Sequence, residues 1–342
     1  MADELIVVDT GSIDQSREIA TTCGARVLEF PWTGHFSDAR NTALDAAAGH
    51  WILYLDADEV LEVGDPAGFR STLASGDDIV VFRPLLKSRS NWTPYREYRI
   101  FRNRADLRFR GTMHETIVPD VARIMREEGL GVAPINALIC HSGYDGDQSH
   151  KHRRDLPLLE IEVVRTPDRA YLWDHIGRIH EALGNESAAE SAWERAVTIV
   201  RESDSRLGVD GLPYANLLTL RLVADRPDLA LAEEAIDRFP GNPVSLWAGA
   251  ATAMAAGTWA GAVEWIDRLL ALDRNAIAED ALAIDESLLG HAAYDLKGQA
   301  LFELGAFGDA EAAFARAEVL APDDPAYRVR RKLASARALL AR

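Results

Sequence analysis

Apolar and polar positions in the first part of the chain alternate between two periods, which predicts strands separated by helices. Short apolar runs at Leu5–Asp9, Arg26–Phe30 and Trp51–Leu55 have the length and composition of strands. Between them, Ser16–Cys23 and Phe36–Ala48 have helical patterns. Such an order predicts an α/β domain with a parallel, twisted sheet and right-handed crossovers.

The pattern becomes strand-rich between Asp78 and Gly143, with the runs DIVVFRPLL, REYRIFR and INALICHSGY. From residue 83 to residue 110 the chain is also locally basic. Two interpretations stay open. The charges either solvate an edge strand of the sheet, or they form a basic rim that meets a phosphorylated donor.

After about residue 150 the strand pattern stops, and an Ala/Leu/Glu/Arg-rich sequence with internal repeats follows. The repeated positions share one set of offsets: Trp173, Gly177, His180, Gly184, Ala189, Trp193 and Ala196 in one copy, Tyr294, Gly298, Leu301, Gly305, Ala310, Phe314, Ala317 and Pro322 in a second, and Leu246, Ala250, Gly257, Ala262, Ile266 and Leu269 in a third. The offsets match the tetratricopeptide repeat, a helix–turn–helix unit of about 34 residues. Residues 212–245 resemble a degenerate copy. We therefore expect two domains, residues 1–150 and residues 151–342, the second an all-α solenoid.

The composition narrows the classes of function. A chain of 342 residues suggests about two domains. Its 37 basic and 54 acidic residues give a net charge of −17, which argues against a nucleic-acid partner because such binding needs a positive field. We find neither an apolar window long enough for a membrane span nor a signal peptide. With only two cysteines, Cys23 and Cys140, we expect reduced thiols in a cytoplasmic protein.

Acidic residues follow the third strand run directly, in the sequence HWILYLDADE at His50–Glu59. Asp56 and Asp58 form a DxD pair beyond the strand end, which is where ligands bind in α/β sheets. Two carboxylates suit a hard divalent cation, Mg²⁺ or Mn²⁺, whose other ligands are waters and substrate phosphates. A solvated turn would explain the pair alone. Asp9 ends the first run in the same way and precedes a tight turn at Gly11.

Taken together, the motifs VVDTGSID, FPWTGHFSDARNTAL and WILYLDADEVL resemble the family 2 glycosyltransferases of the GT-A fold. The resemblance continues over about residues 4–160, with YRIFRN at Tyr98–Asn103, FRGTMHE at Phe109–Glu115, CHSGY at Cys140–Tyr144 and KHRRDLPLL at Lys151–Leu159. The sequence is especially similar to a bacterial branch with appended tetratricopeptide repeats. This implies a GT-A (Rossmann-like) domain that moves a sugar from a nucleotide sugar, most often a UDP-sugar, to an acceptor. It also implies Mn²⁺ or Mg²⁺ as cofactor and inversion at the anomeric carbon.

The resemblance implies roles for individual residues as well. The matching positions are Asp9, Gly11, Arg40, Asn41 and Asp56 for the nucleotide and its diphosphate, Asp56, Asp58 and His141 for the metal, and Glu115 for the catalytic base. A base is required because the acceptor must lose a proton as it attacks. The alternatives are a surface pair of Glu115 with His114, and a core histidine at position 141.

One departure from the family pattern concerns the start of the chain. Family members carry an earlier strand and helix, with a segment like IVKNEExxL, before the position of Asp9. Here Met1 is followed at once by ADELIVVDTGS. The first strand of the family is therefore expected to be missing, which would leave an unpaired neighbouring edge.

Two functions from different classes follow. The first is a metal-dependent, inverting glycosyltransferase whose repeats meet a peptide or protein acceptor, since such stacks have extended concave surfaces. The second is a noncatalytic tetratricopeptide scaffold with a degenerate transferase domain. The repeats alternatively only brace the first domain or form a homodimer.

Overall fold

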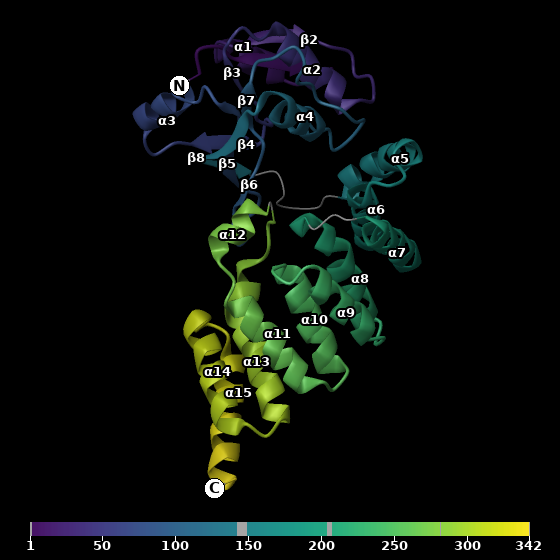
Figure 1. Ribbon diagram of the computed structural model, residues 1–342, viewed down its shortest axis with the longest axis vertical. Coiled ribbons are helices and arrows are strands. Elements are labelled where there is room, and N and C mark those ends of the chain that lie inside the picture. The colour runs from purple at the N-terminus through teal and green to yellow at the C-terminus, as the bar shows by residue number, and fades with distance from the viewer. Residues whose placement is uncertain (1, 142–148, 204–206, 281, 342) are drawn as a thin grey trace. The chain divides into compact units, whose positions relative to one another are not determined.

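The computed structural model describes residues 2–141, 149–203, 207–280 and 282–341 (Figure 1). The chain divides into two compact units, Met1–Arg89 with Arg96–Pro167 and Ser90–Tyr95 with Asp168–Arg342. The division falls at residue 168, whereas the sequence placed it after residue 150. Helix α5 (Ser149–Arg165) consequently belongs to the first unit.

The first unit begins with a two-stranded parallel sheet. Strands β1 (Ile6–Asp9) and β2 (Arg26–Glu29) pair along their whole length, and α1 (Ser16–Thr22) connects them. Helix α2 (Phe36–Ala46) packs against β1. These elements lie where the hydrophobic pattern predicted them, because each apolar run is short and polar residues bound it.

The second sheet of this unit is mixed, so the expectation of a parallel sheet is wrong here. It contains β3 (Trp51–Leu53), β4 (Glu59–Glu62), β5 (Ile79–Lys87), β6 (Tyr95–Arg96), β7 (Ile100–Arg102) and β8 (Gly131–His141), in the order β3-β7-β5-β8-β4 with β6 also beside β5. Strands β5 and β8 are parallel, whereas β3–β7, β5–β7 and β4–β8 are antiparallel. No helix lies between β5 and β7 in the described chain, so the chain turns back beside β5 without a crossover.

Helices cover both faces of this mixed sheet. Val81 and Phe101 pack with α4 (Val118–Glu128) and with Leu44 of α2. Their neighbours Phe82 and Ile100 pack on the opposite face against Phe69 of α3 (Pro66–Ala74). Successive strand residues point to opposite faces, so the same strands serve both cores. Within the described residues, the β1–β2 pair shares no strand with this sheet.

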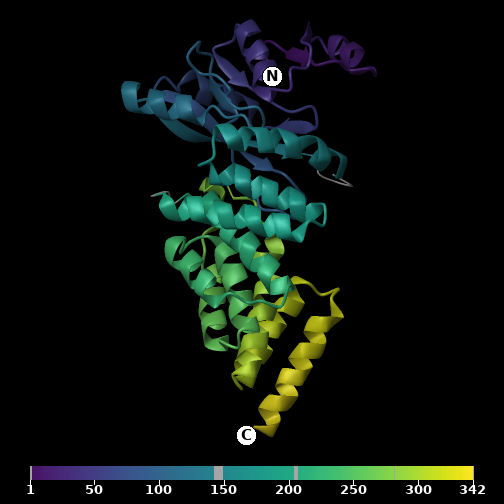
Figure 2. The same ribbon diagram turned by 90° about the vertical axis from the view of Figure 1, so that its right-hand side faces the viewer.

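The second unit is a stack of helices, as the repeats predicted (Figures 1 and 2). Its helices are α6 (Ala170–Ala182), α7 (Glu186–Glu202), α8 (Leu212–Val223), α9 (Leu229–Arg238), α10 (Pro243–Ala255), α11 (Trp259–Leu270), α12 (Arg274–Glu279), α13 (His291–Glu303), α14 (Phe307–Leu320) and α15 (Pro325–Leu340), with short 3-10 turns at Gly208–Gly211 and Glu286–Leu289. Consecutive helices pack as pairs, namely α6 with α7, α10 with α11, and α13 with α14.

Glycines explain why the repeats fold in this way. Gly184, Gly257 and Gly305 end the first helix of their pairs with φ of 77°, 73° and 77°, a conformation that favours glycine. Inside the pairs, a Cβ on Gly177 would lie 2.5 Å from the Trp193 ring. Two helices can thus cross closely over one large side chain, and the tetratricopeptide prediction is confirmed.

The degenerate copy keeps the same backbone path without the glycine. Asp225, after α8, has a φ of 55°, so an aspartate takes the left-handed turn position. Arg221 and Arg226 on either side of it both bond to Glu190, at 3.0 and 2.9 Å. This ion-pair network accompanies the irregular turn.

A short segment from between β5 and β6 is built into the helical unit. Thr93 donates its backbone N–H to the Ile284 carbonyl at 2.8 Å, and Glu286 donates to the Asn91 carbonyl at 2.9 Å. The Thr93 hydroxyl also accepts from the backbone N–H of Ile284. Sequence reasoning did not predict this pairing, because nearly two hundred residues separate its two segments.

Both cysteines are free thiols, Cys23 at the surface and Cys140 partly buried, as expected from their number. None of the helices in the described part of the chain has the length and apolar character that a membrane crossing requires.

Candidate active site

The turn after β3 carries the three acids of the DADE sequence, and they differ in environment. Glu59 is buried and accepts two hydrogen bonds from Arg99, at 2.8 and 2.7 Å. Its Oε2 also accepts the backbone N–H of Asp56 at 2.8 Å. Glu59 is therefore a structural acid that holds the turn, while the Asp56 and Asp58 side chains remain 41% and 40% exposed.

Arg40 of α2 joins two of the predicted site residues. Its Nη2 donates to Asp56 Oδ1 at 2.9 Å, and its Nε donates to Glu115 Oε1. The guanidinium lies over the rings of Tyr54, at 4.8 Å, and Phe109, at 5.5 Å. Burial alone would lower the pKa of Arg40, but the Glu115 and Asp56 carboxylates outweigh it and raise the pKa. Arg40 is thus a permanent cation between two carboxylates.

Glu115 lies on a closed loop whose backbone is constrained at several points. Arg110 and Thr116 exchange backbone hydrogen bonds at 3.1 and 3.0 Å, and His114 has a φ of 51°. A non-glycine residue in this region is strained and is held by its surroundings. The Glu115 side chain is only 9% exposed, so it is enclosed by the loop and does not belong to a surface pair.

Three further residues hold this loop, and sequence reasoning missed two of them. Asp120 of α4 accepts from the backbone N–H of Arg108 at 3.1 Å and from Arg110 Nη2 at 2.8 Å. Glu162 of α5 is buried, and its Oε2 accepts from the backbone N–H of Thr112 at 3.4 Å. The third is Asn41, whose predicted role was nucleotide binding. The sequence could have indicated a buried role for Glu162, because this acid lies between apolar residues on one face of α5.

The side-chain amide of Asn41 forms two hydrogen bonds with the backbone of Phe109. Its Nδ2 donates to the Phe109 carbonyl at 3.0 Å, and its Oδ1 accepts the Phe109 N–H at 2.9 Å. The pair fixes the ring that lies under the Arg40 guanidinium. In this structure Asn41 therefore supports the site indirectly, by holding Phe109 in place.

Asp9 is buried at the end of β1, where it organises the following turn. Its carboxylate accepts from the backbone N–H groups of Gly11, at 3.4 Å, and Ser12, at 3.1 Å. A hydrogen bond with the Ser12 side chain, followed by those with the backbone N–H groups of Ser12 and Gly11, lowers the pKa of Asp9. Gly11 has a φ of 117°, so the turn needs glycine. Among the described residues, Asp9 forms no hydrogen bond or ion pair with Arg40, Asp56 or Glu115.

Asp58 and His141 converge where β4 begins and β8 ends. Asp58 Oδ2 lies 3.4 Å from His141 Nε2. The described side chains contain no group of three or more histidines, cysteines and acids that would enclose an ion. An oxygen and an imidazole nitrogen fit Mn²⁺ or Mg²⁺ only if phosphates and waters supply the remaining ligands, which is common for these ions. Ser142, Gly143 and Tyr144 of the CHSGY motif lie outside the described residues.

Most arginines between residue 83 and residue 110 form hydrogen bonds or ion pairs within the first unit. Arg102 donates to the carbonyls of Gly76 and Ile79, both at 2.6 Å. Other arginines pair with acids nearby: Arg99 with Glu59, Arg104 with Asp106 and Glu128, Arg108 with Asp45, and Arg110 with Asp120. These arginines stabilise the fold, so a basic rim for a donor receives no support from them.

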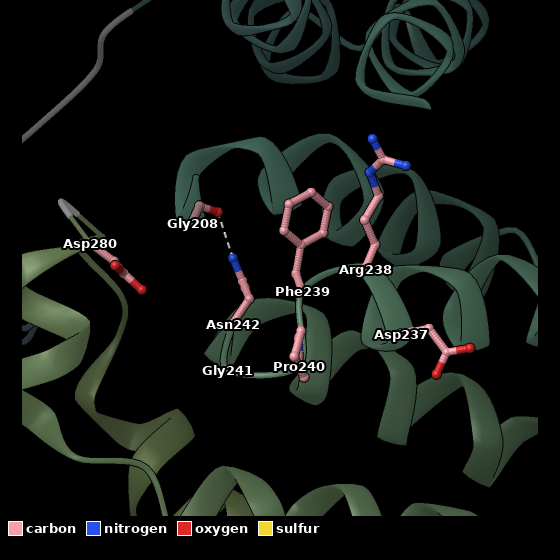
Figure 3. A pocket seen from close by; sticks show the side chains of 8 residues that line it. All are labelled: Gly208, Asp237, Arg238, Phe239, Pro240, Gly241, Asn242 and Asp280. Carbon is pink, nitrogen blue, oxygen red and sulfur yellow. Dashed lines mark hydrogen bonds between the residues drawn. The ribbon is translucent and has the colours of Figure 1, made fainter. Parts of the chain in front are cut away.

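The helical unit contains an open pocket of about 490 Å³ (Figure 3). Two of its polar side chains, Asn242 and Arg238, have partners within the unit. Asn242 donates to the Gly208 carbonyl at 2.6 Å and caps α10, while Arg238 donates to the carbonyls of Val200 and Ser203.

Comparison with known proteins agrees with this geometry. Residues 1–131 match the sequence model of the family "Glycosyl transferase family 2". A TPR repeat-containing protein of Synechococcus elongatus is 36% identical over 194 residues, 55% of this chain and 48% of the relative. An uncharacterized glycosyltransferase of Rickettsia bellii is 43% identical over 61 residues, 18% of this chain and 20% of the relative. The SPbeta prophage-derived glycosyltransferase SunS of Bacillus subtilis is 23% identical over 229 residues, 64% of this chain and 53% of the relative. The chain thus spans about half or less of the length of these relatives.

Solved structures that resemble the chain over about half its length are helical repeat proteins. YrrB, a TPR protein with an unusual peptide-binding site, has a TM-score of 0.41 and 12% identity over 54% of this chain and 84% of its own. BtubC from P. vanneervenii has a TM-score of 0.43 and 14% identity over 56% of this chain and 83% of its own. Residues 1–131 of the present chain are thus similar to glycosyl transferase family 2, and the helices of its second unit pack as a tetratricopeptide-like stack.

Proposed function

We propose that the protein is an inverting glycosyltransferase that uses a nucleotide sugar, in the first place a UDP-sugar, together with Mn²⁺ or Mg²⁺. The observation that carries the proposal is the Arg40 guanidinium, which bonds to both Asp56 and Glu115. It brings an acid beyond a strand end, where a donor diphosphate is expected, next to an enclosed carboxylate suited to a base. The family match over residues 1–131 supports the same class of reaction.

In this mechanism Glu115 is the catalytic base. Its carboxylate takes the proton from the acceptor hydroxyl or thiol while the acceptor heteroatom forms a bond to the anomeric carbon. The bond from that carbon to the nucleotide diphosphate breaks on the opposite side, so the configuration inverts. The diphosphate leaves beside Asp56, where the cationic Arg40 stabilises its developing charge.

Asp9, Gly11 and Asn41 have supporting roles in donor binding. The Asp9 carboxylate is held ionised by the turn at Gly11 and Ser12, and we assign it to the hydroxyl or N–H groups of the nucleoside. Asn41 keeps Phe109 in place beneath Arg40. Asp58 and His141 would hold the cation, with Asp56 completing the set once Arg40 turns to the diphosphate. A bound cation would neutralise charge on the leaving group.

We assign donor binding and catalysis to the transferase half, approximately residues 1–150, and acceptor binding to the helical repeats. The acceptor would then be a peptide or a protein, because stacked helical pairs present extended surfaces to such partners. Homodimerisation through the repeats is the alternative use of the same surface.

A second function has one observation in its favour. The β1–β2 pair, with Asp9, shares no strand with the mixed sheet that carries Asp56 within the described residues. A noncatalytic tetratricopeptide scaffold with a degenerate transferase domain would tolerate this separation.

Calorimetry with UDP and GDP, each with and without Mn²⁺, tests the two functions. We expect metal-dependent binding of one nucleotide that Asp58→Ala removes and that Asp45→Asn, an exposed acid on α2, leaves intact. A hydrolysis assay across UDP- and GDP-sugars would then identify the donor. If neither nucleotide binds with or without metal, the scaffold function is favoured and the transferase proposal fails.

A further inference from the structure

One guanidinium serves both carboxylates at the centre of the site. Arg40 Nη2 bonds to Asp56 and Arg40 Nε bonds to Glu115. Arg99, which is paired with Glu59, also interacts electrostatically with Asp56. Arg40 is the cation that bonds directly to both Asp56 and Glu115, so a shift of its guanidinium toward one carboxylate weakens its contact with the other.

This arrangement obstructs the proposed base. Glu115 Oε1 accepts from Arg40, and the Glu115 side chain is only 9% exposed. One of the two Glu115 oxygens is thus engaged by a guanidinium inside a constrained loop, which makes the carboxylate less accessible to a substrate hydroxyl. The structure therefore shows Glu115 in a resting arrangement.

A donor diphosphate would change the balance at Arg40. Guanidinium forks bond to phosphates through two parallel hydrogen bonds, more strongly than through one contact to a single carboxylate oxygen. The Asp56 side chain is 41% exposed, so an anion bound beside it can reach Nη2 from solvent. The Tyr54 and Phe109 rings lie against the guanidinium and do not occupy its hydrogen-bonding N–H groups.

We propose that Arg40 is a positioning residue that couples donor binding to release of the base: the guanidinium leaves Glu115 for the diphosphate when the nucleotide binds. This inference rests on the proposed function, since it needs a diphosphate at Asp56. Its consequence is that Glu115 becomes available to the acceptor only when the donor is present.

Equilibrium binding tests the coupling without any need for turnover. If the diphosphate must draw Arg40 away from Glu115, part of the binding free energy is spent in breaking that pair. Glu115→Gln removes the competing charge and keeps the shape, so UDP (or GDP, whichever the wild type binds) should bind at least about threefold more tightly. The corresponding monophosphate, which lacks the second phosphate, should show a smaller change.

Two variants make the result specific. Asp45→Asn removes one exposed negative charge from the same helix and should leave the nucleotide affinity unchanged. Arg40→Lys keeps the charge but loses the fork, so its diphosphate affinity should fall, and adding Glu115→Gln should no longer tighten it. Thermal unfolding checks that each variant is folded.

The outcomes separate the two proposals. If the wild type binds nucleotide diphosphate and Glu115→Gln binds it equally or more weakly, the coupling is overturned and the proposed function stands. Equal tightening by Asp45→Asn also overturns it, because the effect would then be general charge. If no nucleotide binds to the wild type, the proposed function fails and the coupling fails with it.

Discussion

Arg40 and Glu115 form an ion pair across 75 residues of sequence. The contact connects helix α2 to the constrained loop that follows Phe109. Because Arg40 also bonds to Asp56, the ARN, DADE and GTMHE motifs meet at one side chain. Each motif is a weak signal alone, and their convergence gives the site its chemical meaning.

Glu115→Gln should lower the rate of sugar transfer by about 10²- to 10⁴-fold, since an amide cannot accept the acceptor proton. Steady-state product formation from the donor found by calorimetry measures this. Glu127→Gln, a matched change on the exposed face of α4, should keep the wild-type rate. A near wild-type rate in Glu115→Gln would exclude this residue as the base.

Glu59→Gln should lower the free energy of unfolding by about 3 kcal/mol, because it leaves the Arg99 charge buried without its partner. The Glu59 side chain is 1% exposed and that of Arg99 is 10% exposed. Urea unfolding followed by circular dichroism gives the value. Glu127→Gln breaks an exposed pair with Arg123 and should change stability by at most about 1 kcal/mol. Equal effects in the two variants would contradict the structural role of Glu59.

Gly298→Ala should destabilise the helical unit by about 1–3 kcal/mol through overpacking. A Cβ at this position would lie 2.6 Å from the Phe314 ring in the partner helix. Gly308→Ala is the control, since a Cβ there meets nothing within 4 Å. Thermal unfolding compares them. Replacing the ring by a smaller side chain, Phe314→Leu, in the Gly298→Ala background should recover part of the lost stability. A failure to recover it would argue against a clash between the new Cβ and the ring.

Asp174→Asn should stabilise the protein increasingly as the pH rises. Asp174 is buried and accepts from Asn216 Nδ2 at 2.8 Å, and burial raises the pKa of its carboxyl. The folded protein keeps this proton over a pH range in which the unfolded chain has lost it, so the wild type loses stability through that range. Asparagine has no such loss.

Urea unfolding from pH 4 to pH 8 checks this prediction. The difference between Asp174→Asn and the wild type should be small at the acidic end and should then grow to a plateau. Asp309→Asn, at an exposed position of α14, should show no such growth. A difference that is independent of pH would mean that the carboxyl is not destabilised by burial.

Much of the helical unit could be predicted from spacing alone. The turn glycines and the Gly177–Trp193 and Gly298–Phe314 pairs lie within one repeat, so local offsets encode them. The strands and helices as far as β3 could also be predicted within a few residues, whereas α3, β4 and α4 were not predicted. The direction of the strands in the mixed sheet could not be predicted. The spacing of hydrophobic residues indicates which side chains are buried, but it does not indicate which strands become neighbours.

The residues of the candidate site could likewise be predicted from the sequence, but their contacts could not. The sequence marked Asp56, Asp58, Glu115, His141 and Arg40 as chemically relevant, while their contacts stayed open. It did not distinguish Glu59 from the two acids beside it, since only burial against Arg99 makes Glu59 structural. It also assigned Asn41 to the nucleotide, whereas the structure places its amide on Phe109.

By itself the sequence determined the strands and helices at the start of the chain, that a tetratricopeptide-like stack follows an α/β domain, and which side chains can carry the chemistry. These properties depend on residue types at short spacing. Only the tertiary structure decided that Arg40 lies between Asp56 and Glu115, that Asp58 meets His141, and that the Asn91–Thr93 segment joins the helical unit. The physical reason is that such contacts depend on distant parts of the chain packing together, which no local period encodes.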